Sequence, residues 1–362
     1  MTNASSECCK KPADNPPCCC GSATVQKDMP AALPPIDRRG DIMCRLSNRF
    51  RMRYNLPAGL YTIGNPAGNS PVFVTANYRF SCNSLRASVT GMDADAWVLV
   101  LDTKGINVWC AAGKGTFGTA ELISRINRTN LAGFVRHRTL ILPQLGAPGV
   151  AAHEVKTATG FNVSYGPVYA HDIPAYLAAG NKASAAMRKV NFSPRDRLVL
   201  TPMELFPALR KFLWVILGCA VVMGLQPSGI LFKTSVIHSW PIISIGLLAV
   251  LVGTVVTPLL LPIIPFRSFA AKGALAGAVL LAPLLFFIDQ FFCGSIFLAS
   301  SVLLFFIVLA SYLALNFTGC TPFTNISGVK KEMRFAVPAY LTACGISAVL
   351  LLIFKVQEWG LL

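Results

Sequence analysis

Charged residues are scarce in this chain, and acidic residues are the scarcest of all. Only 13% of its 362 residues are charged, with 16 acidic against 32 basic, whereas 54% are hydrophobic. Soluble domains carry about 25% charged residues, so we expect part of the chain to lie in lipid. The basic residues are scattered and no nucleic-acid-binding motif is present. The composition therefore predicts a membrane partner and no nucleic acid.

Signals for export and for structural zinc are missing as well. The first forty residues contain no long apolar stretch of the kind that forms a secretory signal. We therefore expect the soluble part to stay in the cytoplasm, where disulfides are rare. None of the twelve cysteines forms a Cys-x-x-Cys pair with zinc-finger partners. The stretch "HEVKT" has Thr157 where a zinc-protease helix needs a second histidine.

Hydrophobicity divides the chain into three segments. Residues 1–36 are rich in proline and cysteine and predict a disordered tail. Residues 37–205 have the composition of a soluble domain, and residues 206–362 form a series of apolar spans. A span crosses a hydrocarbon core of about 30 Å with ~20 residues. This predicts an all-α transmembrane domain of about five helices, near 210–225, 241–264, 270–289, 294–316 and 335–354.

Basic residues between the spans predict the orientation. One side would hold Arg267, Lys272, Lys330, Lys331 and Arg334, and the other side only Lys233 and Lys355. Because cytoplasmic loops carry the excess of lysine and arginine, the first side is expected to be cytoplasmic. We expect a multi-pass protein of the inner (cytoplasmic) membrane, with the soluble domain inside and Leu362 outside.

The soluble domain shows the pattern of an α/β fold. Short apolar strands alternate with helical periods, which favours a doubly wound, Rossmann-like parallel sheet covered on both faces. The strands are expected at 71–76, 96–103, 138–144 and 161–168, and the helices at 79–89, 119–129, 150–160 and 172–180. Ligands of such folds bind at the carboxyl ends of the strands. Thr75, Cys110 and the loop 144–149 follow strands, so we expect them to converge on one crevice.

The stretch "GKGTFG" (113–118) matches the G-x-G-x-x-G dinucleotide fingerprint. That fingerprint joins a strand directly to a helix, but here about ten residues separate it from the strand that ends near Thr103. A phosphate loop is not indicated either, because Gly115 follows Lys114 where serine or threonine would be needed. A membrane-anchored, nucleotide-binding regulator stays open as an alternative on this stretch alone.

Cys110 lies within "INVWCAAGKGTFG" (106–118), between Trp109 and a run of alanines and glycines. A buried cysteine that packs as a small hydrophobe is the simplest interpretation. The small residues, however, leave the backbone open to a large flat ligand. If a helical turn forms here, its dipoles and Lys114 would favour the thiolate, which is a strong ligand for soft or borderline metals.

The octapeptide "NVWCAAGK" (107–114) resembles the signature of the mercury-methylating corrinoid proteins. The resemblance continues through "VTANY" (74–78), "LDTKGINVWCAAGKGTFGT" (101–119) and "LILPQLGAPGVAAHEVK" (140–156), which are similar to the corrin-binding domain of corrinoid iron–sulfur proteins. It extends to "FTGCTPFTNISGVKKEMR" (317–334) and covers about residues 55–355.

The resemblance implies a corrinoid cofactor of the cobalamin type and a site for it. Cys110 matches the cysteine that binds cobalt from the lower face and is the implied metal ligand and catalytic residue. The neighbours implied to surround the corrin are Thr75, Asn77, Asn107, Val108, Trp109, Ala111, Gly113, Gly146 and Gly149.

The implied activity is that of a corrinoid-dependent methyltransferase, which passes a cobalt-bound methyl group to inorganic Hg(II) and forms methylmercury. The implied partners are a ferredoxin-like protein with two [4Fe–4S] clusters, which reduces cobalt, and an upstream methyltransferase that supplies the methyl group. A metal-trafficking or transport protein, in which the spans carry the function, is a second alternative. The cysteines of "ECCKKPADNPPCCCG" (7–21) allow the further hypothesis that the tail captures Hg(II), against an accessory tail without that role.

Overall fold

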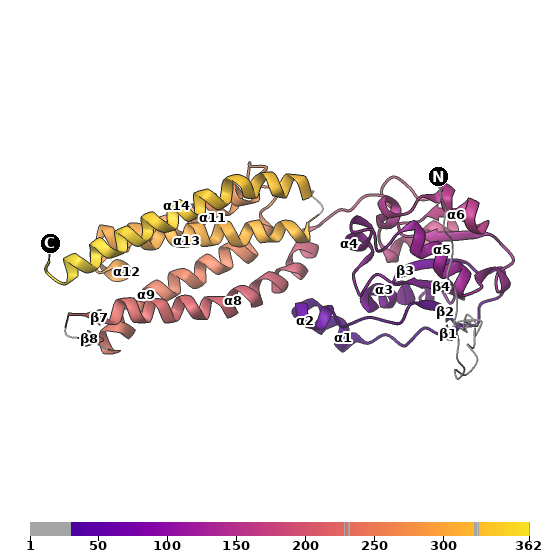
Figure 1. Cartoon of the computed structure of the whole chain (residues 1–362), viewed down its shortest axis with the longest axis horizontal. Coiled ribbons are helices and arrows are strands. Elements are labelled where there is room, and N and C mark those ends of the chain that lie inside the picture. The colour runs from indigo at the N-terminus through magenta and orange to yellow at the C-terminus, as the bar shows by residue number, and fades with distance from the viewer. Residues whose placement is uncertain (1–29, 228, 231, 322–323, 325, 362) are drawn as a thin grey trace, which may run out of the picture.

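The computed structural model describes residues 30–361 except 228, 231, 322, 323 and 325, and the account below concerns those residues. An α/β domain and a bundle of long helices follow one another along the long axis of the molecule (Figure 1). The fold class predicted from the sequence is confirmed. The cysteine-rich stretch 7–21, with its hypothesis of Hg(II) capture, lies outside the described residues.

The sheet of the α/β domain has six strands in the order β1-β2-β4-β3-β5-β6. The strands are β1 (Ala31–Ala32), β2 (Gly59–Ile63), β3 (Val72–Ala76), β4 (Ala96–Leu101), β5 (Thr139–Leu142) and β6 (Asn162–Tyr165). Strands β4, β3, β5 and β6 are parallel neighbours, as the sequence predicts. Strand β2 pairs antiparallel with β4, and β1 adds to β2 at the edge. From β3 the chain continues to β4 on one side of it and then crosses to β5 on the other side. The switch point, where the strand order reverses, therefore lies between β3 and β5.

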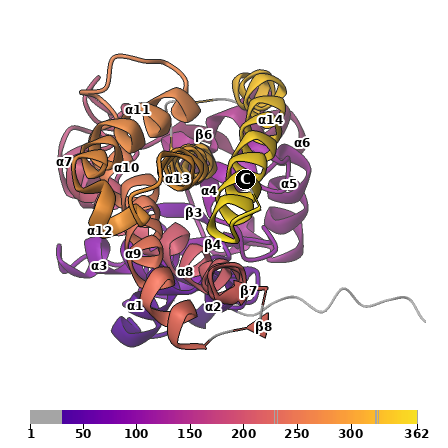
Figure 2. The same ribbon diagram turned by 90° about the vertical axis from the view of Figure 1, so that its left-hand side faces the viewer.

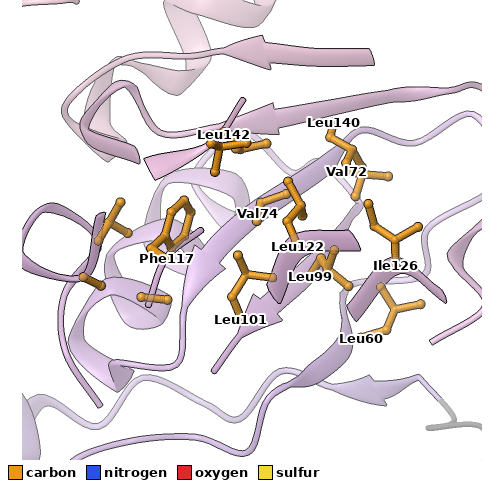
Figure 3. Close-up of a cluster of buried hydrophobic side chains, with 14 of the residues drawn as sticks. Leu60, Val72, Val74, Leu99, Leu101, Phe117, Leu122, Ile126, Leu140 and Leu142 are labelled. Carbon is orange, nitrogen blue, oxygen red and sulfur yellow. The ribbon is translucent and has the colours of Figure 1, made fainter. Parts of the chain in front are cut away.

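Both faces of the sheet are buried. The helices are α1 (Arg38–Leu46), α2 (Asn48–Arg51), α3 (Arg79–Thr90), α4 (Val108–Gly113), α5 (Thr119–Arg128), α6 (Ala152–Thr159) and α7 (Ile173–Ala178), with short turns η1 (Leu131–Gly133), η2 (Gln144–Gly149) and η3 (Ala170–Asp172). Successive strand residues point to opposite faces. Leu99 and Leu101 therefore pack with Leu122 of α5 on one face (Figure 3), while Val98 and Val100 pack with α3 and α7 on the other.

Strands β1 and β2 and helix α1 are not anticipated by the sequence pattern. Strand β2 is short and lies between Pro57 and Gly64, so turn-forming residues hide it. Strand β1 lies within residues 1–36, the predicted tail, of which residues 30–36 are described. The predicted domain boundaries at 36 and 205 stay predictions, and helix α8 (Pro194–Gly224) continues across the second of them.

Five helical stretches in the described part of the chain are long and apolar enough to cross a membrane, in agreement with the predicted number. They are Pro194–Gly224, Ser235–Leu259, Phe269–Phe292, Ile296–Gly319 and Ser327–Glu358. Their elements are α8, α9 (Phe232–Leu251), η4 (Val252–Val256, a π-helical turn), α10 (Thr257–Leu259), α11 (Phe269–Leu281), η5 (Ala282–Phe287), α12 (Ile288–Phe292), α13 (Ile296–Asn316), η6 (Phe317–Cys320) and α14 (Ile326–Glu358), with a small hairpin of β7 (Leu225–Gln226) and β8 (Gly229–Ile230).

Helix α13 lies in the middle of the bundle when it is viewed from its end (Figure 2). It packs closely on α11, where a Cβ at Gly273 would come within 2.6 Å of the Ala314 side chain. Gly277, one turn later, faces Ala310 in the same way. Small residues four apart let two helix backbones approach, which is how helices commonly associate in a bilayer. Close packing of small residues therefore joins α11 to α13, beside an apolar core of larger side chains.

Candidate functional site

A cavity of about 670 Å³ opens at the carboxyl ends of the parallel strands. Thr75 near the end of β3, Leu142 at the end of β5 and Gly166 just after β6 form its floor. This position beside the switch point is where open α/β sheets bind their ligands. The first turn of α4 forms one wall, through Asn107, Val108 and Trp109. The structure thus brings the strand ends and the start of the signature helix to one cavity, whereas Cys110, Gly146 and Gly149 are not among the residues that line it.

Asn77 fixes the loop that leads to α4. Its side-chain oxygen accepts the backbone N–H groups of Thr103 (3.1 Å) and Gly105 (2.9 Å), and its amide group donates to Asp102 (3.2 Å). The loop needs this support because Lys104 and Gly105 have φ values of 57° and 74°, in the left-handed region. Asn77 is buried and acts on the loop, and it is not among the residues that line the cavity.

Asn107 begins α4 and orients Cys110. The Asn107 side-chain oxygen accepts the backbone N–H of Cys110 at 3.1 Å, which is the usual N-cap bond of a helix start. Val108, Ala111 and Ala112 anchor the other side of α4 in the core. The position of Cys110 is therefore fixed by a cap on one side and by packing on the other.

The outer face of α4 is open. Cys110 is half-buried, and Gly113, three residues later on the same face, is exposed. A Cβ at Gly113 or at Gly115 would meet no atom within 4 Å. Trp109 next to the thiol is 37% exposed and lines the cavity. A flat ligand can approach this face without meeting a side chain at Gly113.

Gly146 and Gly149 belong to η2, which packs beneath α4. A Cβ at Gly146 would come within 2.5 Å of the Phe117 ring, and one at Gly149 would collide with the Phe117 carbonyl oxygen. Phe117 itself is fully buried. These glycines allow η2 and α4 to pack closely, so they support the signature helix from below. Phe117 also gives "GKGTFG" a packing role, since its ring fills the space against Gly146.

The opposite wall of the cavity comes from segments that the sequence pattern does not connect with the site. Cys44 and Arg51 of α1 and α2, and Met203 of α8, line this wall. The Cys44 thiol and the Tyr78 hydroxyl are hydrogen-bonded at 2.8 Å. Burial raises the pKa of Cys44 and also that of Tyr78, so both groups stay protonated at neutral pH. No sequence motif joins these three residues to the signature.

The charged groups around the cavity make it electropositive. Arg45, Arg51 and Arg195 line it, against Asp196 alone among acidic residues. Asp196 already accepts the backbone N–H of Ser193 at 2.8 Å in the capping box that begins α8. Arg51 lies 5.4 Å from the centre of the Tyr78 ring, and Arg45 lies 5.0 Å from that of Phe80. The cavity suits an apolar body that carries anionic or amide substituents.

These residues fit a corrinoid. The cavity lies within the range of about 300–1,000 Å³ that is usual for cofactor clefts, and its walls are mostly apolar. The open face beside Gly113 leaves space for a broad ring, and the Cys110 sulfur is a suitable donor for cobalt. No group of three or more histidine, cysteine, aspartate or glutamate side chains that could hold a metal occurs among the described residues. The assignment of Cys110 as metal ligand stays a prediction.

The α/β domain, which forms the floor of this cavity, is similar to known proteins. Residues 51–177 match the family described as CO dehydrogenase/acetyl-CoA synthase delta subunit. An acetyl-CoA decarbonylase/synthase complex subunit gamma of Methanopyrus kandleri is 34% identical over 119 residues, which are 33% of this chain and 25% of that protein. The corrinoid/iron-sulfur protein large subunit of Moorella thermoacetica is 30% identical over 120 residues, 33% of this chain and 26% of that protein.

The chain thus spans about a quarter of the length of these relatives. The α/β part is similar to this family over residues 51–177, and the predicted resemblance to corrinoid iron–sulfur proteins is confirmed. The matched residues include α4 and the ends of β3, β5 and β6, and they stop before α8.

Proposed function

We propose that this protein binds a corrinoid in the cavity between the strand ends and α4 and carries a methyl group that it transfers to inorganic Hg(II). The single observation that supports this most is Cys110, placed on the open face of a capped helix beside the switch-point cavity. The name of the Moorella relative supports the corrinoid. The resemblance of "NVWCAAGK" to the mercury-methylating corrinoid proteins supports mercury as the acceptor.

The corrinoid would supply the cobalt that carries the methyl group, and a thiolate donor to that cobalt favours release of the methyl group with its bonding electrons. Hg(II) is an electrophile and accepts a group of that kind. Cys110 would hold the metal as a thiolate, so its proton must leave when the cofactor binds. The cap from Asn107 keeps the sulfur-bearing residue in place during this change.

The remaining predicted residues divide into two groups by their surroundings. Thr75, Asn107, Val108 and Trp109 line the cavity and would contact the cofactor or the methyl acceptor. Asn77, Gly146 and Gly149 would act through α4, since they hold its loop and the turn beneath it. Gly113 contributes by having no side chain, and Ala111 by anchoring the helix.

Two proteins would complete the cycle. A ferredoxin-like protein with two [4Fe–4S] clusters would return the cobalt to its reduced state, and a corrinoid methyltransferase would supply the methyl group. Both would act from the cytoplasm, on the side of the inner membrane where the α/β domain is proposed to lie.

Cobalt analysis of the purified full-length protein, with its absorption spectrum, tests the proposal. We expect stoichiometric cobalt and the spectrum of a corrin. A cobalt-free protein that binds nucleotide, or one that transports metal without a corrinoid, would refute it. Incubation of the methyl-loaded protein with Hg(II) then tests the acceptor, because a protein that retains its methyl group there would keep the corrinoid assignment and lose the mercury assignment.

A further inference from the structure

Helix α1 has an apolar face that points away from the protein. Ile42, Met43 and Leu46 are 57%, 47% and 37% exposed, whereas Gly40 and Cys44 of the same helix are buried. At 100° per residue, Ile42 and Leu46 lie on the side of the helix opposite Gly40 and Cys44, and Met43 lies between the two sides. One side of this short helix packs against the protein, and its apolar residues on the other side are exposed. Contiguous exposed apolar groups mark interaction sites, so we expect this side to contact another surface.

Arginines surround this apolar face. Besides Arg45, which lines the cavity, four exposed arginines lie on and around α1 and α2: Arg38, Arg39, Arg49 and Arg53. The two nearby acidic groups are turned to internal partners. Asp37 accepts the backbone N–H of Gly40 at 2.8 Å, and Asp41 accepts the side-chain amide of Asn83 at 2.8 Å. We call the three exposed apolar residues of α1 and these four arginines the interfacial patch.

The interfacial patch lies at the level of the membrane surface. Arg51 of α2 donates to the Met203 sulfur of α8 at 3.1 Å. The predicted span begins near residue 210, and the exposed Arg210 and Lys211 mark the edge of the hydrocarbon core on α8. Met203 is about two helical turns beyond that edge, on the headgroup side. Helices α1 and α2 lie just beyond the end of the bundle in Figure 1, where lipid headgroups would be.

We propose that the interfacial patch docks on the anionic headgroups of the same bilayer that the bundle crosses. The three apolar side chains would enter the boundary between headgroups and acyl chains, and the four arginines would bind lipid phosphates. This is the arrangement of an amphipathic helix that lies in the plane of a membrane. The proposal depends on the five long helices crossing a bilayer and is independent of the corrinoid and of mercury.

A lipid surface is favoured over an acidic protein by position. A bundle that spans the bilayer brings the patch to the headgroups without any binding step, because α2 is tied to α8. Docking would also fix one wall of the cavity, since Cys44 and Arg51 belong to the same two helices.

The test uses the full-length protein in lipid nanodiscs. Discs of phosphatidylcholine alone are compared with discs that also contain phosphatidylglycerol, and hydrogen exchange is followed by mass spectrometry for residues 38–53. We expect exchange to be about tenfold slower in the anionic discs, and the difference to shrink at high salt. The variant R38Q/R39Q/R49Q/R53Q should exchange at the same rate in both discs.

The matched control removes three exposed basic residues far from the bundle, in the variant R128Q/R136Q/K156Q. It should keep the lipid dependence of the unaltered protein. Equal exchange of residues 38–53 in both discs would overturn the proposal, and so would slow exchange that survives loss of the four arginines. Protection that appears only when a two-cluster ferredoxin is added would also overturn it, because the patch would then bind a protein.

Discussion

Leu99 and Leu341 have the same side chain in opposite surroundings. Leu99 of β4 is fully buried, whereas Leu341 of α14 is 70% exposed. In the α/β domain every residue of β3 and β4 is buried, while in the most apolar window of α8 only 6% of residues are buried. The difference lies in the expected solvent, because lipid removes the cost of an exposed apolar side chain. Apolar burial thus positions the cavity in one half, and close packing of small residues joins α11 to α13 in the other.

The bundle also buries two basic side chains. Arg197 and Lys272 are 4% and 9% exposed, and both donate to backbone carbonyls at or just after the end of α10. Those carbonyls lack partners within the helix, so the cations satisfy them. Meanwhile Trp214 and Phe286 are 75% and 89% exposed. The bundle thus buries these two cations and exposes large apolar side chains, in addition to its buried apolar core.

The largest expected effect is on methylmercury formation, when a cysteine of the α/β domain is replaced and compared with a cysteine of the bundle. Cys110 and Cys344 are both half-buried free thiols, but only Cys110 is proposed to bind cobalt. Cys110→Ala should lower methylmercury formation by at least about a hundredfold, since removing a ligand exceeds the 10–100-fold cost of losing an outer-shell partner. Cys344→Ala should leave the rate unchanged. Methylmercury and corrinoid content are measured in the same samples. If Cys110→Ala forms methylmercury at the wild-type rate, Cys110 only packs in the protein and does not bind cobalt.

The two leucines give the next largest effect. Leu99→Ala should lower the free energy of unfolding of the α/β domain by about 2–5 kcal/mol, because it leaves a cavity in the core. Leu341→Ala should change stability by less than about 0.5 kcal/mol, as exposed positions usually do. Urea denaturation of the protein in detergent, followed by tryptophan fluorescence, measures both. A similar loss from each substitution would mean that α14 faces protein at Leu341.

The space around individual glycines gives a third contrast. Gly149 in the α/β domain and Gly273 in the bundle both permit close backbone approach, but Gly113 has open space around it. Gly149→Ala should therefore cost about 1–3 kcal/mol of stability through overpacking. Gly113→Ala should leave stability unchanged and weaken corrinoid binding by roughly tenfold, or ~1.4 kcal/mol. Corrinoid affinity is measured by reconstituting each variant with corrinoid and recording its absorption spectrum. Full affinity in Gly113→Ala would mean that the ring does not lie over Gly113.

The last contrast is a pH dependence of the α/β domain that appears only at high pH. Burial raises the pKa of Cys82 from its ordinary 9.0 to about 12. Below pH 9.0 the thiol is protonated in both states, but between these two values only the unfolded chain releases the proton. Stability should therefore fall as pH rises through this window, by up to ~1.4 kcal/mol per pH unit.

The variant Cys82→Ala isolates this thiol from other groups that titrate at high pH. Its stability should decline less steeply than that of the unaltered protein between about pH 9 and about pH 11 in urea denaturation. Parallel declines would show that the thiol ionises in the folded state at its ordinary pKa.

Much of this fold is predictable from local pattern, since strands β3 to β6, helices α3, α5 and α6 and the five apolar stretches all follow hydrophobic periodicity. Cys110 and α4 are recognised from a contiguous motif. Strand β2 is missed because five residues between turn formers give little periodic signal. The wall made by Cys44, Arg51 and Met203 is missed for another reason: these residues are more than fifty positions from the signature, and only tertiary packing joins them.

Asn77 shows where motif-based assignment reaches its limit. The resemblance places it beside the corrin, and the assignment stays a prediction. The structure shows that its side chain is used by the loop 102–105, which no spacing in the sequence reveals. A hydrogen-bond network of this kind depends on the left-handed turn at Lys104 and Gly105, and it joins Asn77 to a loop that begins 25 positions later in the chain.

Helix α8 begins at the cavity and ends at the far side of the bundle. Its 31 residues make a rod about 46 Å long, with Arg195 and Met203 in the cavity wall at one end. A change in the tilt of the bundle, of the kind that a thinner or thicker bilayer causes, would therefore also move this end of the helix and the cavity wall that it carries. Pro202 and Pro207 lie inside the helix near this wall, where a proline removes a backbone hydrogen bond. Through α8, the thickness of the membrane would thus affect the shape of the cavity.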